Sequence, residues 1–293
     1  MDTEDIRHTT PRGAGMPSLA ETLVVLCLVM GIMLLILQAV RVIEPGIFKL
    51  LGGSRFNVVL LIELLAIGLP LAVLFSVRRY NLSQSLGLAT CGFSPLAGSG
   101  LMGAGTVLFA PQCEAWLARL IPPPEGYLET MADFLTLKSG ESLAWALFCM
   151  ALIPALFEEA LFRGILLRSA LVRMSRPAVI VGVGVAFALF HLDIWRAPVI
   201  CLIGMLITWI AIRTASLWPA VVFHIVHNSL SLILLNLKIT GERGWIEGTA
   251  DMPAPLLALG VFLLICGAII LPQKQPREKD RATESGTGLN NSA

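Results

Sequence analysis

Residues 23–40 read LVVLCLVMGIMLLILQAV, an apolar run with a single polar side chain near its end. A helix needs about 20 such residues to cross the hydrocarbon core of a bilayer. Similar runs recur along the whole chain and are separated by charged clusters, as membrane-spanning helices require. On this length scale we predict spans at residues 20–40, 57–77, 95–116, 142–162, 177–194, 197–212, 217–237 and 253–272.

The composition supports this reading. Of the 293 residues 56% are hydrophobic and only 14% are charged, whereas a soluble domain carries about 25% charged residues. Such a chain could not cover a water-facing surface with polar groups. The net charge of +1 without a basic patch argues against a nucleic-acid partner. The sequence therefore predicts an all-α, polytopic membrane helical bundle of about eight transmembrane helices, with the lipid bilayer as its partner.

Lysines and arginines indicate how the bundle is oriented. An even number of spans puts both termini on one side, and that side carries the larger share of the 21 basic residues. The longest loop on the opposite side is acidic, with Glu125, Glu129, Asp133 and Glu141. Because basic loops stay in the cytoplasm, we expect cytoplasmic termini and an integral protein of the cytoplasmic (inner) membrane.

Two further segments have structural signatures. The predicted span 95–116 contains Gly98, Gly100, Gly103 and Gly105. Small residues let helix backbones approach closely in lipid, so these glycines predict a tight helix–helix contact. Residues 121–140 begin with three prolines and continue with spaced apolar side chains, which is typical of a short interfacial helix.

The fourth span ends in an unusual cluster of charge. Residues 151–164 read ALIPALFEEALFRG, in which Glu159 and Arg163 are four apart and can pair on one helix face. Glu158 points elsewhere, towards an apolar face. Ionisable residues inside a bilayer are costly and persist when paired, hydrated or needed. The pair is either an interfacial one solvated by headgroup water or part of a site with a carboxylate free for general-base chemistry.

Three of the four histidines also lie inside apolar spans, in FALFH at 187–191 and FHIVHNS at 223–229. His224 and Asn228 share a helix face, and His227 lies on the neighbouring stripe. A single such histidine is usually a helix–helix hydrogen bond. Three of them, with a glutamate pair and an asparagine on three spans, predict one shared functional site that includes His191.

These residue types suit the hydrolysis of a carbonyl compound. Glu158 and His191 could hold and deprotonate a water molecule, while His224 and Asn228 could donate to the resulting oxyanion. No serine or cysteine is obviously paired with the histidines, and we interpret the nearest candidate, Ser229, as a packing residue.

A bound metal is the alternative to a water activated by protein groups alone. A catalytic zinc site could draw its ligands from Glu158, His191, His224 and His227. The HExxH motif is absent, however, so we prefer the activated water. Glu63, inside VVLLIELL at 58–65, either bonds a neighbouring helix or faces the same cavity.

Three motifs together resemble a known family. They are Glu-Glu-x-x-x-Arg at 158–163, Phe-x-x-x-His at 187–191 and His-x-x-x-Asn at 224–228. The pattern resembles the CAAX protease and bacteriocin-processing family, which includes the ras-converting CAAX endopeptidase of eukaryotes, and covers about residues 140–237. RTASLWP at 213–219 also looks like the family's approach to its last motif.

The resemblance implies a role for each matched residue. Glu158 and His191 would activate water, Glu159 and Arg163 would support the site, and His224 with Asn228 would form the oxyanion hole. His227 is outside the family pattern. With Phe187 and Glu63 it is a candidate for lining the substrate cavity. The family has been described both as metalloproteases and as glutamate proteases, so a divalent metal such as zinc stays an alternative.

The function implied is that of an intramembrane endopeptidase. Its substrate would be a membrane-associated or lipidated protein or peptide, prenylated or carrying a C-terminal sorting or anchor segment, cut near its C-terminus. A proton-coupled transporter using the glutamates and histidines, or a non-catalytic immunity or scaffold protein, are the competing hypotheses. We expect a polar cytoplasmic tail at 1–17, membrane helices and an interfacial loop at 18–140, a catalytic core at 141–240, a last helix at 241–272 and a disordered tail at 273–293.

Overall fold

The computed structural model describes residues 15–43, 54–237 and 250–271, and the regular elements in those ranges are all helical. The predicted tails at 1–17 and 273–293 lie almost wholly outside these ranges. In chain order the helices are α1 (Leu19–Ile43), α3 (Phe56–Ile62), η1 (Glu63–Gly68), α4 (Leu69–Arg78), α5 (Leu82–Leu86), α6 (Phe93–Leu120), α7 (Tyr127–Leu135), α8 (Leu143–Leu147), η2 (Phe148–Leu152), α9 (Ile153–Glu159), η3 (Ala160–Leu166), α10 (Leu167–Leu171), α11 (Arg176–Phe190), α12 (Ala197–Thr214), α13 (Trp218–Asn236) and α14 (Ala254–Ile270).

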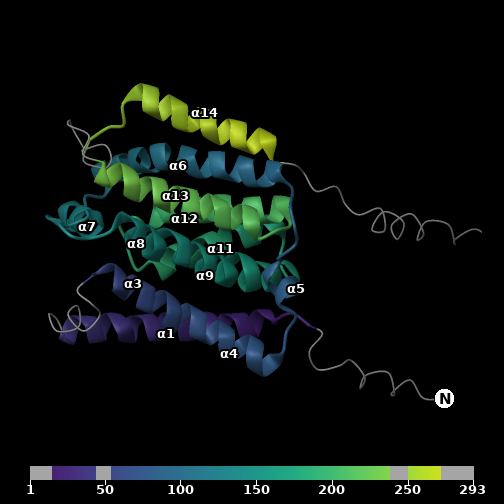
Figure 1. The fold of residues 1–293 in the computed structure, drawn as a ribbon. Helices are drawn as coiled ribbons and strands as arrows, with labels where there is room; N and C mark the ends of the chain where they lie inside the picture. Colours follow the sequence, from purple (N-terminus) through teal and green to yellow (C-terminus); the bar gives the residue numbers. More distant parts are fainter. Residues whose placement is uncertain (1–14, 44–53, 238–249, 272–293) are drawn as a thin grey trace, which may run out of the picture.

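These elements confirm the predicted polytopic helical bundle. Among the described residues six helices are long and apolar enough to cross a membrane, and α11 and α14 are shorter apolar helices at two further predicted positions. Leu35 and Ile269 are 71% and 77% exposed, as expected for side chains that face lipid. Figure 1 shows α1 beginning and α14 ending at the same end of the bundle.

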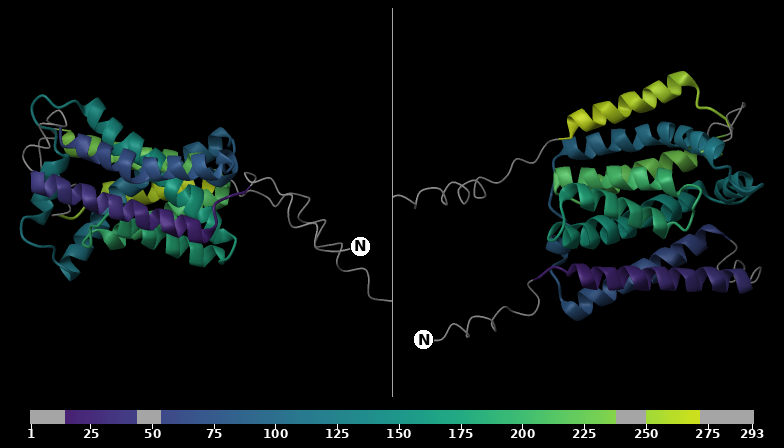
Figure 2. Two further views of the ribbon diagram at one scale, coloured as in Figure 1. Left: turned by 90° about the horizontal axis from the view of Figure 1, so that it is seen from below. Right: turned by 180° about the vertical axis from the view of Figure 1, so that it is seen from behind.

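The segment with the three motifs lies in the middle of the bundle. From one side to the other, α14 packs on α6, α6 on α13, and α13 on α12 and α9, while α11 packs on α12. The helix Phe56–Arg78 and α1 cover the opposite side through η1. The views in Figures 1 and 2 agree on this order. The motif helices are therefore shielded by the helices that precede and follow them in the sequence.

Two spans contain wider π-helical turns where a proline follows. η1 runs into Pro70 and η2 into Pro154, each at the start of the next α-helical segment. Proline has no N–H and its ring clashes with the carbonyl four residues earlier, so a wider turn relieves both problems. The carbonyl that loses its donor to Pro154 is that of Met150, which becomes important at the site.

The glycines of α6 make the predicted tight helix–helix contacts. A Cβ on Gly98 would lie 2.9 Å from the carbonyl oxygen of Gly267, and one on Gly105 would lie 2.7 Å from that of Gly260, both in α14. On the α13 side, a Cβ on Gly103 would lie 2.6 Å from the carbonyl oxygen of Phe223. Backbone atoms cannot move aside as side chains do, so the three helices approach this closely only because these positions lack a Cβ.

Replacing Gly103 by Ala should therefore destabilise the bundle by about 1–3 kcal/mol, since the new methyl group overpacks a backbone contact. Gly100→Ala is the matched control, because its Cβ would meet nothing nearer than 3.7 Å, from Val222. Thermal unfolding of the two variants in detergent measures the difference. Equal melting temperatures for the two variants would contradict this account of the α6–α13 contact.

Candidate active site

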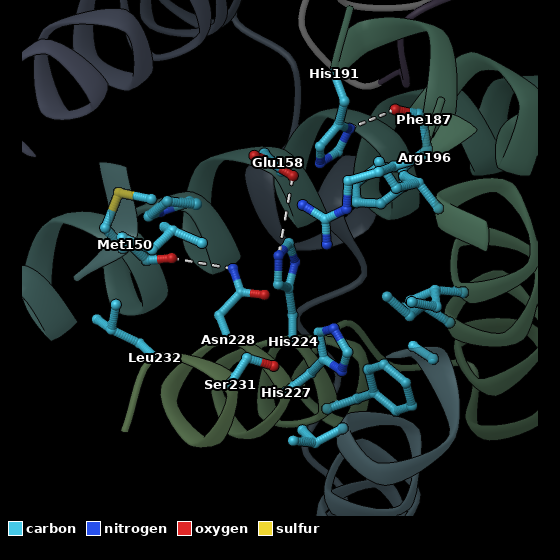
Figure 3. A pocket seen from close by; sticks show the side chains of 18 of the residues that line it. Met150, Glu158, Phe187, His191, Arg196, His224, His227, Asn228, Ser231 and Leu232 are labelled. Carbon is cyan, nitrogen blue, oxygen red and sulfur yellow. Dashed lines mark hydrogen bonds and ion pairs between the residues drawn. The ribbon is translucent and has the colours of Figure 1, made fainter. Parts of the chain in front are cut away.

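A cavity of about 380 Å³ lies between the motif helices and brings the predicted residues together. Its walls come from α3 and η1, α6, the last residue of α7, the span Leu143–Leu171, the end of α11 and the turn after it, and α12 and α13. Figure 3 shows the polar side chains directed into this space. The ionisable and amide side chains that line it are Glu63, Glu114, Glu158, His191, Arg196, His224, His227 and Asn228.

Glu159 and Arg163 form the pair expected from their spacing. Arg163 Nη1 donates to Glu159 Oε1 at 2.8 Å, and both side chains are fully buried. The guanidinium also donates from Nη2 to the carbonyl oxygen of Gly204 at 2.9 Å and lies over the ring of Phe187, 4.4 Å from its centroid. Two nitrogens and one face of this guanidinium are held, while its Nε has no hydrogen-bond partner among the described residues, and this arrangement suits a supporting role.

His224 is held by the same carboxylate. Its Nδ1 lies 2.8 Å from Glu159 Oε1 and donates its hydrogen to that oxygen. The opposite ring atom, Nε2, lies 4.0 Å from Glu158 Oε2, the contact drawn as a dashed line in Figure 3. The adjacent glutamates therefore have different roles, since Glu159 orients the imidazole and Glu158 faces its free edge.

Glu158 is the less compensated of the two. It is 6% exposed, and its Oε2 has no hydrogen-bond partner among the described residues. Glu159 Oε2 also lacks one, but Glu159 Oε1 is bonded to both Arg163 and His224. An unpartnered carboxylate oxygen in a buried position is costly unless something binds there. The atom is directed into the cavity, where a water molecule or substrate would be that partner.

His191 follows the last residue of α11 and lines the same cavity. The predicted span 177–194 was too long, because the helix ends at Phe190 and residues 191–196 form a turn into α12. His191 Nδ1 lies 2.8 Å from the carbonyl oxygen of Phe187. A carbonyl only accepts, so Nδ1 carries the hydrogen and Nε2 keeps a lone pair available as an acceptor.

Asn228 depends on the π-helical stretch η2. Its Nδ2 donates at 3.0 Å to the Met150 carbonyl oxygen, which lacks a partner four residues later because position 154 is proline. This bond fixes the amide, and the second N–H of Nδ2 has no partner among the described residues. Figure 3 shows Asn228 and His224 side by side at the cavity.

His227 and Glu63 also line the cavity. The hydroxyl of Thr106 donates to the Gly103 carbonyl oxygen at 2.7 Å and lies 2.9 Å from His227 Nδ1, so the imidazole donates to it. Glu63 is 3% exposed and lines the cavity together with Glu158. Of the two readings of Glu63, this position matches the cavity-facing one.

The four predicted metal ligands do not form a ligand set in this arrangement. Across residues 15–43, 54–237 and 250–271 no three His, Cys, Asp or Glu side chains are grouped so that they could hold a metal ion. Glu159 and Thr106 instead orient two of the imidazoles through Nδ1.

Sequence reasoning missed several residues of the cavity. Arg196 and Glu114 line it and form an ion pair at 2.9 Å, and the Met150 carbonyl and the Thr106 hydroxyl hold two of the site side chains. Pro154 was the signal that the Met150 carbonyl lacks its helical donor. Nothing in the sequence indicated that Glu114 and Arg196 would meet, since they are 82 positions apart.

In comparison with known proteins, one segment of the chain matches a family model. Residues 140–230 match the family model described as type II CAAX prenyl endopeptidase Rce1-like. No curated protein and no solved structure matched the chain. The matched segment contains all six residues of the predicted catalytic set, from Glu158 to Asn228. Residues 140–230, within a bundle of membrane-type helices, are therefore similar to the Rce1-like type II CAAX prenyl endopeptidases.

Proposed function

We propose that the protein is a glutamate-type intramembrane endopeptidase that hydrolyses a peptide bond near the C-terminus of a membrane-associated or lipidated substrate. The observation that carries the proposal is the approach of Glu158 Oε2 to His224 Nε2, 4.0 Å apart, in a cavity that His191 and Asn228 also line. The family match favours a protease over a proton-coupled transporter or a scaffold.

The two acceptors that face the cavity would activate the water molecule. Glu158 Oε2 and His191 Nε2 can each accept one hydrogen of a water molecule between them, which turns a lone pair of the water oxygen towards a scissile carbonyl. As that oxygen bonds to the carbonyl carbon, one proton passes to Glu158. When the C–N bond breaks, the same proton can pass to the leaving amine.

Two donors that face the cavity would stabilise the negative charge that develops on the carbonyl oxygen. Asn228 has an N–H that Met150 does not use. When doubly protonated, His224 keeps Nδ1–H on Glu159 and directs Nε2–H into the cavity. Two fixed donors in a largely apolar cavity stabilise an oxyanion well, because they need no reorganisation during the reaction. Glu159 stabilises the imidazolium, and Arg163 holds Glu159 in place.

The cavity's setting and the family match support the proposed substrate class. Apart from its polar groups the cavity is walled by apolar side chains such as Ile200, Ile203 and Leu235. It therefore suits an extended, mostly aliphatic peptide segment that enters from the lipid. A prenylated C-terminal CAAX sequence has this character, and so does a C-terminal sorting or anchor segment.

Mass spectrometry of membrane-protein C-termini tests the proposal directly. Cells that produce the wild-type protein should contain shortened C-termini that are absent when they produce Glu158→Ala. The purified protein in liposomes should release a C-terminal peptide from a prenylated CAAX substrate at the same rate with or without EDTA. Identical C-termini in both cell lines would refute proteolysis, and loss of cleavage in EDTA would replace the glutamate mechanism by a metal-dependent one.

A further inference from the structure

The turn that carries His191 has few backbone hydrogen bonds of its own. Its two local backbone bonds are long, at 3.2 Å from His191 N to Ala188 O and from Leu192 N to Leu189 O. Leu192 adopts a φ of +52°, which is unfavourable for a branched side chain, and this side chain is 47% exposed. Such a conformation persists only where surrounding groups impose it.

Asp193 supplies the link to those surroundings. Its Oδ1 accepts the backbone N–H of Arg196 at 3.2 Å, which closes the turn. Its Oδ2 accepts the hydroxyl of Tyr127, from α7, at 2.5 Å. Burial, followed by the Asp193 carboxylate, raises the pKa of Tyr127, so its hydroxyl remains a donor well above neutral pH. On the far side of the turn, Arg196 Nε donates to Glu114 Oε1 in α6 at 2.9 Å.

The other end of α7 is anchored to α13. Asn236, the last residue of α13, donates to the Leu135 carbonyl oxygen at 3.0 Å and accepts the N–H of Leu137 at 2.6 Å. Arg55 donates to the carbonyl oxygens of Phe134 and Thr136. No residue of α7 is fully buried. These bonds, together with the packing of Phe134 and Leu135 near Phe56, hold the C-terminal end of the helix in place.

α7 therefore connects the two halves of the site. One end is tied to the helix that carries His224 and Asn228, and the other end is tied to the turn that carries His191. Figure 1 shows α7 at one end of the bundle. Of the bonds that tie the N-terminal end of α7 to this turn, the described residues contain only the one from Tyr127 to Asp193.

We propose that Tyr127 is a positioning residue that acts through Asp193 to hold the imidazole of His191 at the distance from Glu158 that water activation needs. This inference rests on the proposed function. A misplacement of about 1 Å can cost about 100-fold in rate, whereas substrate binding by the rest of the cavity would be largely unaffected. In this proposal α7 links the turn with His191, on the water-activating side, to α13 with His224 and Asn228, on the oxyanion-stabilising side.

Tyr127→Phe tests this with the loss of a single hydroxyl. In the purified protein cleaving a prenylated CAAX peptide, kcat should fall by about 10- to 100-fold while KM changes little. Asp193→Asn, which keeps an acceptor oxygen for Tyr127, should retain more activity than Asp193→Ala. The matched control is Tyr80→Phe, because Tyr80 also donates to a carboxylate, that of Glu21 at 2.8 Å, and does not line the cavity.

Hydrogen exchange measured by mass spectrometry separates this inference from the proposed function. In Tyr127→Phe, and not in Tyr80→Phe, residues 191–196 should exchange faster, whether or not a cleavable substrate has been found. The positioning role of Tyr127 is refuted if the wild type cleaves, Glu158→Gln does not cleave, and Tyr127→Phe retains full kcat. The proposed protease function is supported by the same result. Unchanged hydrogen exchange at residues 191–196 in Tyr127→Phe would by itself refute the positioning role of Tyr127.

Discussion

Glu158→Gln should lower the rate of peptide cleavage by about 10³-fold, in the middle of the range for loss of a general base. The substitution keeps the size of the side chain and removes its ability to take a proton. Because Oε2 of Glu158 accepts no hydrogen bond from the described residues, no protein donor loses its partner there, and the fold should be retained. Turnover of a fluorogenic prenylated peptide by the purified variant in liposomes provides the measurement.

The control for this experiment is Glu129→Gln, which makes the same chemical change on the exposed face of α7. It should leave both the rate and the melting temperature unchanged. A Glu158→Gln protein that cleaves at the wild-type rate would show that Glu158 is not the base. The proposed mechanism would then have to be abandoned even though the residues share a cavity.

Arg163→Met should be the most destabilising single substitution at the site, by about 3–5 kcal/mol, because it leaves the buried Glu159 carboxylate without its cation. Arg163 and Glu159 have no exposed side-chain surface, so solvent cannot compensate for the loss. Activity should be lost as well, since Glu159 also orients His224 through Nδ1. Titration of the folded protein with SDS gives the free energy of unfolding.

A double-mutant cycle separates the ion pair from simple packing. The Glu159→Gln/Arg163→Met protein should be more stable than Arg163→Met, because the uncompensated charge is gone. Lys138→Met is the exposed counterpart, since its pair with Asp133 is 58% and 70% exposed, and such pairs contribute little. If Arg163→Met were as harmless as Lys138→Met, the buried network would not be what holds His224.

Local signals in the sequence were enough for the bundle. Among the described residues, apolar length identified the positions of the six helices long enough to cross a membrane and of the shorter α11 and α14, and the glycines of the 95–116 span indicated the contacts that α6 makes. The prediction was wrong at the end of the span 177–194, because apolar length does not show where a helix ends. Residues 191–194 are not helical, because the chain turns there towards α12 and is held by Asp193, which apolar length alone does not reveal.

The site could be predicted only in part, for a similar reason. The pairing of Glu159 with Arg163 follows from helix geometry, because residues four apart share a face. The π-helical turns before Pro70 and Pro154 were not anticipated, although the prolines are visible in the sequence. The bond from Asn228 to Met150 needs both the missing N–H at Pro154 and the arrival of α13 beside η2.

By itself the sequence determined that the protein is an all-helical membrane bundle, where its helices lie, and which polar side chains are too costly in lipid to be incidental. These are properties of one segment at a time, set by apolar length and helical period. Only the tertiary structure decided that Glu158 faces His224, that Glu63 lines the same cavity, and that Tyr127 reaches the turn of His191. Such contacts depend on how separate helices pack and rotate against one another, which no local pattern encodes.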